Sequence, residues 1–326
     1  MSDGKETSVK EQVKILAIVG PTASGKSALA LRLATHLDAE IVSADSRQIY
    51  RELTIGSAKP CKEELQQVRH HFIDERSLPA PYDAGTFAAE AETRLAEILS
   101  RGKVPIVVGG STLYVQSLVQ GLAALPKSDP EVRKRLYEEL HTLGAQALYA
   151  RLKSIDPQQA QTLDPTKTQR LIRSLEIIEL TGERVSELQR RAHRAPRFSF
   201  CVIGLALPRP VLYARINARV LEMMRKGLLE EARWLYEKFG RQHQQEKINA
   251  LETVGYKELF EMFEGKHSLE EAIAQIQQHT RNYAKRQITF FRNKLSVHWI
   301  AAPEREQDIA FALQRVISIF PQPVFQ

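Results

Sequence analysis

The amino-acid sequence predicts an α/β protein whose parallel sheet is interrupted by an all-helical insertion. Short apolar segments alternate with segments of helical spacing between residues 14 and 120, a pattern typical of buried parallel strands covered by helices. Residues 121–198 show only helical periodicity, broken by prolines. A further buried-strand pattern at residues 200–207 (FCVIGLAL) then indicates that the sheet resumes after the insertion.

Local patterns place the individual elements. Residues 14–19 (KILAIV) are predicted to form a strand, and residues 26–37 a helix, because Leu29, Leu33 and Leu37 fall on one face. The remaining expected elements are a strand at 40–43, a helix at 87–101, strands at 104–108 and 200–207, helices at 209–239, 252–263 and 269–293, and a strand at 297–300. Trp234 and Trp299 are expected in the core.

These elements divide the chain into four parts: an N-terminal tail (1–12), the first part of the α/β core (13–120), the helical insertion (121–198), and a completion of the core with basic C-terminal helices (199–326).

Composition narrows the class of protein. Cys61 and Cys201 are the only two cysteines and lie too far apart to form paired metal half-sites, which favours a reducing cytoplasm. No stretch approaches the ~20 apolar residues that span a bilayer, and the first residues lack a signal-peptide pattern, so we expect no membrane partner. The formal net charge of +7 suits a polyanionic partner. A monomer is expected.

Residues 20–27 (GPTASGKS) match the phosphate-loop pattern G-x-x-x-x-G-K-[ST], between a predicted strand and a predicted helix. In such a P-loop, successive backbone N–H groups and the helix N-terminus surround phosphate oxygens, and Lys26 adds a positive charge. The hydroxyl of Ser27 can bind a magnesium ion. The motif therefore predicts a P-loop NTPase-like core that binds a di- or triphosphate, the property usually described as nucleotide or ATP binding.

Two polar positions follow predicted strands, where ligands bind in open parallel sheets. Asp45 could hold magnesium through water or act as a general base, but it could equally be a turn or helix N-cap residue. The strand at 104–108 ends in Gly109, Gly110 and Ser111 without the acid that P-loop hydrolases normally carry, which favours group transfer over ATP hydrolysis. The Ser111 hydroxyl could contact a ligand or cap a helix.

Basic residues recur at helical spacing in two regions. Arg281, Lys285 and Arg292 share one face of the predicted C-terminal helix, and Tyr283 and Phe290 lie opposite. In the insertion, Lys167, Arg170 and Arg173 recur in the same way. Both faces could meet the phosphates of a nucleic acid, or be solvated surface.

Eight motifs in order along the chain resemble the bacterial tRNA dimethylallyltransferase (tRNA isopentenyltransferase) family. They are GPTASGKS (20–27), IVSADSRQIY (41–50), IGSAKP (55–60), HHFID (70–74), PIVVGGSTLY (105–114), QRLIRSLEI (169–177), VGYKEL (254–259) and RNYAKRQITFFR (281–292). Two departures are Ser111, where the family usually has threonine, and the sequence GSAKP at 56–60, where it usually has GTAKP. Both departures keep a small or hydroxylated residue.

The resemblance implies transfer of a dimethylallyl group from dimethylallyl diphosphate to the exocyclic amine of the adenosine immediately 3′ of the anticodon in tRNA. Diphosphate is released with the help of Mg²⁺. It further implies that Asp45 is the general base, with Ser111 near the reacting centre. The implied diphosphate-binding residues are Gly20, Thr22, Ala23, Ser24, Gly25, Lys26, Ser27 and Arg219. The implied residues for the anticodon loop are Asp45, Ser46, Arg47, Gln48, Ser111, Arg133, Gln169, Arg170, Leu171, Ile172 and Arg173, to which the basic face adds Arg281 and Lys285.

Three other functions share part of this pattern. A P-loop metabolite kinase would have the loop and a strand-end Asp, but it needs neither the helical insertion nor the basic helix. A related transferase could use a free adenine nucleotide as acceptor. A non-catalytic RNA-binding protein could retain a vestigial phosphate loop, against which the intact Lys26, Ser27 and Asp45 argue.

Overall fold

The computed structural model describes residues 13–121, 125–191 and 195–320, so the tail expected at 1–12 lies outside the described residues. The chain divides into two compact units. One comprises Met1–Val119 with Arg197–Gln326, and the other comprises Gln120–Pro196. The first is called the α/β unit here and the second the helical unit.

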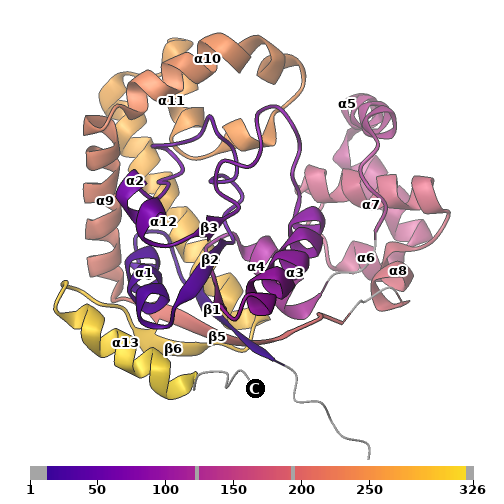
Figure 1. Ribbon diagram of the computed structural model, residues 1–326. Helices are drawn as coiled ribbons and strands as arrows, with labels where there is room; N and C mark the ends of the chain where they lie inside the picture. The colour runs from indigo at the N-terminus through magenta and orange to yellow at the C-terminus, as the bar shows by residue number, and fades with distance from the viewer. Residues whose placement is uncertain (1–12, 122–124, 192–194, 321–326) are drawn as a thin grey trace, which may run out of the picture. The chain divides into compact units, whose positions relative to one another are not determined.

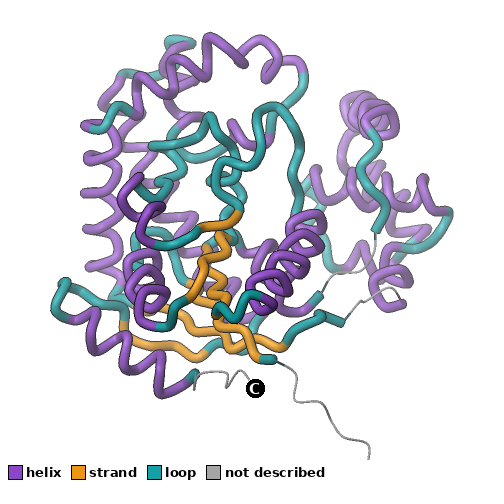
Figure 2. The backbone as a smooth tube through the Cα atoms, viewed as in Figure 1, coloured by secondary structure: helices purple, strands orange, loops and turns teal. Residues whose placement is uncertain are grey.

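A single parallel sheet forms the centre of the α/β unit (Figures 1 and 2). Within the described residues its strands are β1 (Lys14–Val19), β2 (Ala39–Ser43), β3 (His70–His71), β4 (Val104–Gly109), β5 (Ser199–Ala206) and β6 (His298–Ala301). Their order is β3-β2-β4-β1-β5-β6, and every pairing is parallel. Because all strands point the same way, their carboxyl ends meet at one edge of the sheet. The expected α/β class with a P-loop-like parallel core is confirmed.

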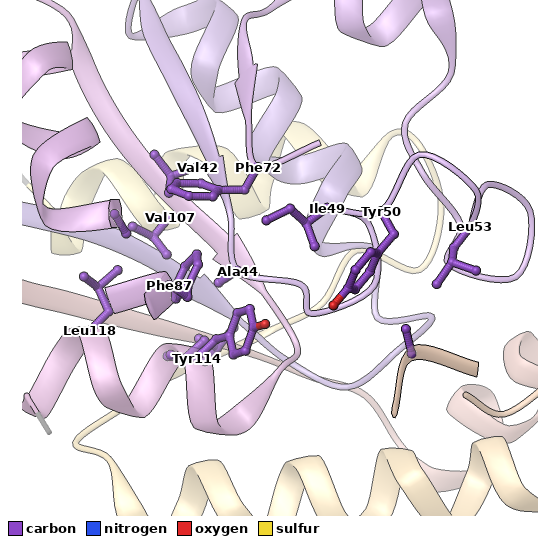
Figure 3. Packing of buried hydrophobic residues seen from close by; sticks show 14 of the residues in the cluster. Val42, Ala44, Ile49, Tyr50, Leu53, Phe72, Phe87, Val107, Tyr114 and Leu118 are labelled. Carbon is purple, nitrogen blue, oxygen red and sulfur yellow. The ribbon is translucent and has the colours of Figure 1, made fainter. Parts of the chain in front are cut away.

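Alternate residues of β1 enter two different cores, as the period of a strand requires. Leu16 and Ile18 pack in a cluster with α1 (Lys26–His36) and α13 (Asp308–Ile319). Ile15, Ala17 and Val19 point to the opposite face, which α3 (Ala84–Ser100) and α4 (Thr112–Gln120) cover. On that face the rings of Phe87 and Tyr114 stack with centroids 4.6 Å apart, and Phe72 meets Phe87 edge-on (Figure 3). The sheet is therefore buried on both sides.

Helices after β5 complete the α/β unit. They are α9 (Arg209–Arg225), α10 (Leu228–Gln245), the 3-10 turn η1 (Asn249–Glu252), α11 (Tyr256–Phe263) and α12 (Leu269–Lys294). The single helix predicted at 209–239 is wrong: Gly227 adopts a left-handed conformation (φ 98°) that ends α9 and begins α10. Trp234 was also wrongly expected in the core, because it is 45% exposed on α10. The short helix α2 (Lys62–Gln67) was not predicted.

The helical unit has its own apolar core. Its helices are α5 (Pro130–Ile155), α6 (Pro157–Gln161), α7 (Thr168–Thr181) and α8 (Val185–Arg191). Buried leucines of α5 and α7 pack together, among them Leu136, Leu152 and Leu175. Two carboxylates are also fully buried there, Asp156 and Glu176.

No helix in the described ranges is both long and apolar enough to cross a bilayer.

Candidate active site

The phosphate loop connects the end of β1 to the start of α1, as predicted. Ala23 (φ 62°) and Gly25 (φ 85°) both adopt positive φ, which curves the loop and turns its backbone toward a common centre. No side chain caps the N-terminus of α1, and its first turn contains no acid. The helix therefore presents its positive dipole end to the space above the loop.

The predicted diphosphate-binding residues contribute in different ways. Thr22, Lys26, Ser27 and Arg219 line one cavity of about 110 Å³, which we call the charged cavity. Gly20, Ala23, Ser24 and Gly25 are not among its lining residues, so they shape the loop through their backbone. The Ser24 side chain is fully buried, and in the described structure its hydroxyl has no hydrogen-bond partner.

Two cations lie close together in the charged cavity. Burial, reinforced by the positive charge of Arg219, lowers the pKa of Lys26 to about 8, and the negative charge of Asp45 opposes this shift. Burial also lowers the pKa of Arg219, again against the attraction of Asp45. Two desolvated positive charges beside one carboxylate form a local excess of positive charge, which a diphosphate would neutralise.

Asp45 and Ser111 follow the neighbouring strands β2 and β4, and Ser111 contacts Ser46, the residue after Asp45. Oδ1 of Asp45 accepts hydrogen bonds from the backbone N–H groups of Arg47 (2.8 Å) and Gln48 (3.4 Å). Asp45 therefore does stabilise a turn, which is one of the roles expected from the sequence. It fixes the orientation of the carboxylate, while Oδ2 accepts no hydrogen bond from any residue that the structure describes. Ser111 Oγ accepts from the backbone N–H of Ser46 (2.9 Å) and donates to the Ser46 hydroxyl (3.2 Å).

A second cavity, of about 330 Å³, adjoins the first and is called the apolar cavity. Its apolar lining comes from α9, α10, α12 and the segment between η1 and α11: Ile216, Val220, Met223, Leu228, Val254 and Ile276. Ser46, Arg47 and Ser111 also line it. The residues that line both cavities are Thr22, Asp45, Ser57, Ala58, Arg219 and Tyr283.

Two site residues on α12 were missed. Tyr283, which we assigned to the packing face of the helix, lines both cavities. Burial, with help from the charge of Asp45, raises the pKa of its hydroxyl to about 12. Gln287 is buried one turn further along, where its Oε1 accepts from Thr22 N–H (2.9 Å) and its Nε2 donates to Gly110 O (2.8 Å). Their i, i+4 spacing was visible in the sequence, but it indicated only that the two residues share a face.

Several predicted RNA-binding side chains of the α/β unit already have partners within the protein. Arg47 donates to Thr253 Oγ1 (2.6 Å) and Asn249 O (3.1 Å). Gln48 donates to the backbone oxygens of Ser57 (3.3 Å) and Ala58 (3.1 Å). Arg281 donates to Asn217 Oδ1 (2.7 Å) and lies over the ring of Tyr213, whereas Lys285 is exposed.

In the helical unit the predicted RNA-binding residues divide by burial. Gln169 and Arg170 are exposed on α7. Leu171 and Ile172 are 1% and 0% exposed within the core, so their side chains cannot reach an RNA. Arg173 donates to Glu176 and to Pro126 O, and Arg133 donates to Ser128 Oγ (3.1 Å).

The fold and these cavities together define a P-loop α/β enzyme in which a cavity lined by two cations adjoins an apolar cavity. A family model described as IPP transferase matches residues 48–294. The chain belongs to this family, that of the tRNA dimethylallyltransferases.

Named relatives agree with this assignment. The chain is 57% identical to a tRNA dimethylallyltransferase of Chlorobaculum parvum, over 91% of this chain and 96% of the relative. It is 55% identical to the enzyme of that name from Chlorobium limicola, over 91% and 93%.

Solved structures are similar along nearly the whole chain. A tRNA isopentenylpyrophosphate transferase of Bacillus halodurans is 36% identical with a TM-score of 0.68, covering 94% of this chain and 96% of that one. A eukaryotic dimethylallyltransferase described as acting on tRNA is 27% identical with a TM-score of 0.79, covering 96% and 81%.

Proposed function

We propose that this protein transfers a dimethylallyl group from dimethylallyl diphosphate to the exocyclic amine of the adenosine immediately 3′ of the anticodon in tRNA. The observation that carries the proposal is the junction of the two cavities. A positively charged cavity suited to a diphosphate opens, at Asp45, Arg219 and Tyr283, into an apolar cavity suited to a hydrocarbon group and a base. A donor and an acceptor could meet at this junction.

The phosphate side of the junction supports departure of the diphosphate. When the bond between the prenyl carbon and the diphosphate oxygen breaks, negative charge grows on that oxygen. Lys26, Arg219 and the N-terminus of α1 are already positioned to balance this charge, and they need little reorganisation to do so. The pair of desolvated cations is the main support for this role.

Asp45 is suited to serve as the base. The amine lone pair of adenine is delocalised into the ring, so proton removal during formation of the nitrogen–carbon bond assists attack. The Arg47 and Gln48 amides hold Oδ1, leaving Oδ2 to take the proton from the amine. Ser111 helps to hold the turn that carries Asp45, because its Oγ accepts a hydrogen bond from the backbone N–H of Ser46. The phenol of Tyr283, neutral at physiological pH, can donate a hydrogen bond at the same junction.

The residues also fit a magnesium ion. Within the described residues no group of three or more His, Cys, Asp or Glu side chains could form a protein cage for a metal. Mg²⁺ commonly binds substrate phosphates, waters and one or two protein oxygens instead, and Ser27 supplies an exposed hydroxyl on the charged cavity. Bound there, the ion would neutralise charge on the diphosphate.

We further propose that the RNA is contacted by side chains that are exposed at the protein surface. Gln169 and Arg170 on α7 and Lys285 on α12 are exposed and suit phosphate or base contacts.

We also propose that the protein is a monomer and acts in the cytoplasm. The free thiols of Cys61 and Cys201 suit a reducing compartment, and light scattering of the purified protein tests the monomer.

The test of the function uses labelled dimethylallyl diphosphate, Mg²⁺ and three acceptors. An anticodon stem-loop with adenosine 3′ of the anticodon should become labelled. The same stem-loop with guanosine there should not, because guanine presents a carbonyl oxygen where adenine has its amine. Free AMP should also stay unlabelled. Efficient labelling of AMP, or none of the adenosine stem-loop, would refute the tRNA assignment.

A further inference from the structure

Glu231, in the first turn of α10, binds three successive backbone amides of a distant loop. Its carboxylate accepts hydrogen bonds from the N–H groups of Thr54 (3.1 Å), Ile55 (2.9 Å) and Gly56 (2.9 Å). Consecutive amides that converge in this way form a concave anion-binding site. Here the bound anion is a side chain of the same protein, from a residue about 175 positions later in the sequence.

Tyr256, at the start of α11, reinforces the same contact. Its hydroxyl donates to Glu231 Oε1 (2.7 Å), and the side chain is fully buried. Burial and the negative charge of Glu231 raise the pKa of Tyr256 well above its usual value, so the hydroxyl stays a donor. The ring lies so close to Gly56 that an added Cβ would stand 2.4 Å from Tyr256 Cζ. Only glycine allows this approach.

The other side of the loop is held as firmly. Gln48 Nε2 donates to the backbone oxygens of Ser57 and Ala58, and its Oε1 accepts from Ser43 at the end of β2. Lys59, with a side chain 4% exposed, donates to Tyr50 O and to Asp74. The N–H groups of residues 54–56 thus bind Glu231 of α10, while the carbonyl groups of residues 57–58 bind Gln48, which in turn contacts the end of β2. We call residues 54–58 the wall loop.

The wall loop forms part of the lining of both cavities. Gly56 lines the apolar cavity, and Ser57 and Ala58 line both cavities. Leu228, which begins α10, also lines the apolar cavity. A shift of the loop relative to α10 would therefore change the width of the space beside Asp45.

We propose that Glu231 is a positioning residue for the transfer reaction, holding the wall loop so that the junction of the two cavities fits the dimethylallyl group. This inference rests on the proposed function. Glu231 is not among the residues that line the charged cavity or the apolar cavity, so it acts through the loop. Its carboxylate is suited to this role because both oxygens can accept several N–H groups at once.

The decisive variant is Glu231→Gln, which keeps the shape of the side chain but turns an NH₂ group toward N–H donors. We expect the KM for dimethylallyl diphosphate to rise about tenfold, equivalent to about 1.4 kcal/mol, with unchanged affinity for the RNA stem-loop. Glu231→Asp, which restores the carboxylate, should recover part of the loss. Glu230→Gln is the matched control, because Glu230 is exposed in the same helical turn and its loss removes the same charge near the helix dipole.

Hydrogen exchange tests the same contact without relying on activity. In the wild type and in Glu230→Gln, the amides of Thr54, Ile55 and Gly56 should exchange slowly, and in Glu231→Gln at least about tenfold faster. Unchanged exchange and KM in Glu231→Gln would overturn the proposal. So would a fall in melting temperature and kcat with KM unchanged, because that result indicates a purely structural role. A wild-type protein that transfers no prenyl group would refute the proposed function, while the exchange data would still decide whether Glu231 holds the loop.

Discussion

The charges buried at the phosphate site and the charges buried in the helical unit are held in opposite ways. In the α/β unit, Lys26 and Arg219 lie close together and desolvated, and burial lowers the pKa of both. In the helical unit, the buried carboxylate of Glu176 accepts hydrogen bonds from Ser128 Oγ, Asp129 N–H and Arg173. Asp156 likewise accepts from Gln159 N–H and from the N–H and hydroxyl of Ser186.

This difference distinguishes buried charges that suit ligand binding from buried charges that stabilise the fold. Desolvated charges that repel each other cost stability in the free protein, and a protein retains them where a ligand neutralises them. Fully satisfied buried carboxylates, in contrast, fix helix ends and turns. For Asp156, burial alone would raise the pKa, but the hydrogen bonds from Ser186 and Gln159 outweigh burial and lower it. The interior of the helical unit is therefore structural, and its contacts with a partner must come from its surface.

The largest expected effect is that of Asp45→Asn. An amide at this position keeps the turn but cannot take a proton, so turnover should fall by roughly 10²–10⁴. Affinity for both substrates should stay near that of the wild type. Single-turnover kinetics with saturating substrates measures the chemical step, and a near-normal rate would remove Asp45 from the role of base.

Lys26→Met tests how much the desolvated charge of Lys26 destabilises the free protein. Diphosphate affinity should fall about 10- to 100-fold, the typical contribution of a charge-assisted hydrogen bond. The free protein should nevertheless melt at a higher temperature, because the substitution removes a desolvated cation beside Arg219. Titration calorimetry measures the diphosphate affinity, and scanning calorimetry measures the melting temperature. A variant that loses affinity and also melts lower would show that Lys26 stabilises the free fold.

The pKa of Lys26 predicts a pH dependence in the wild type. Because this pKa is lowered to about 8 from 10.5, the free side chain loses its proton as pH rises through 8. Bound diphosphate raises that pKa again, so binding above pH 8 takes up a proton. Affinity should fall about tenfold between pH 7 and pH 9. By the same linkage, the free protein gains stability from this group as pH rises from about 8 to 10.5.

Titration calorimetry in two buffers of different ionisation enthalpy measures this proton uptake. Lys26→Met is the control, since it should show neither the uptake nor this part of the pH dependence.

The smallest expected effect is on RNA binding, and it should differ between two arginines of α7. Arg170 is exposed, so Arg170→Ala should weaken RNA binding about fivefold and lower the slope of log affinity against log salt by about one unit. Arg173 instead neutralises the buried Glu176. Arg173→Ala should therefore destabilise the protein by about 1–3 kcal/mol and leave the salt slope unchanged. Equal salt slopes in Arg170→Ala and the wild type would locate the phosphate contacts elsewhere.

The phosphate loop and the strands other than the two-residue β3 could be predicted because each depends on local pattern. β1 has the predicted bounds, Lys14–Val19, and the G-x-x-x-x-G-K-[ST] motif needs only the strand before it and the helix after it. The break at Gly227 was missed, since a single glycine in a helical pattern does not by itself end a helix.

The missed site residues depend on the tertiary structure. Gln287 contacts Thr22 across 265 positions, and Glu231 contacts Thr54 across 177, so no local pattern could pair them. Tyr283 was assigned to the packing face of its helix because an amphipathic pattern does not reveal whether that face meets a core or a cavity. The contact between Arg173 and Glu176 was missed for a related reason, because both residues are visible in the sequence but the burial of Glu176 is not.

The strand order also fixes when the phosphate loop can be completed during synthesis on the ribosome. β1 lies between β4 and β5, and β5 is made only after the whole helical unit, so one edge of β1 stays unpaired while that unit emerges. Gln287, which binds the loop at Thr22, is translated later still. A nascent chain therefore carries the phosphate motif long before it carries a folded phosphate site. The contact between Gln287 and Thr22 can form only when nearly all of the protein has been made.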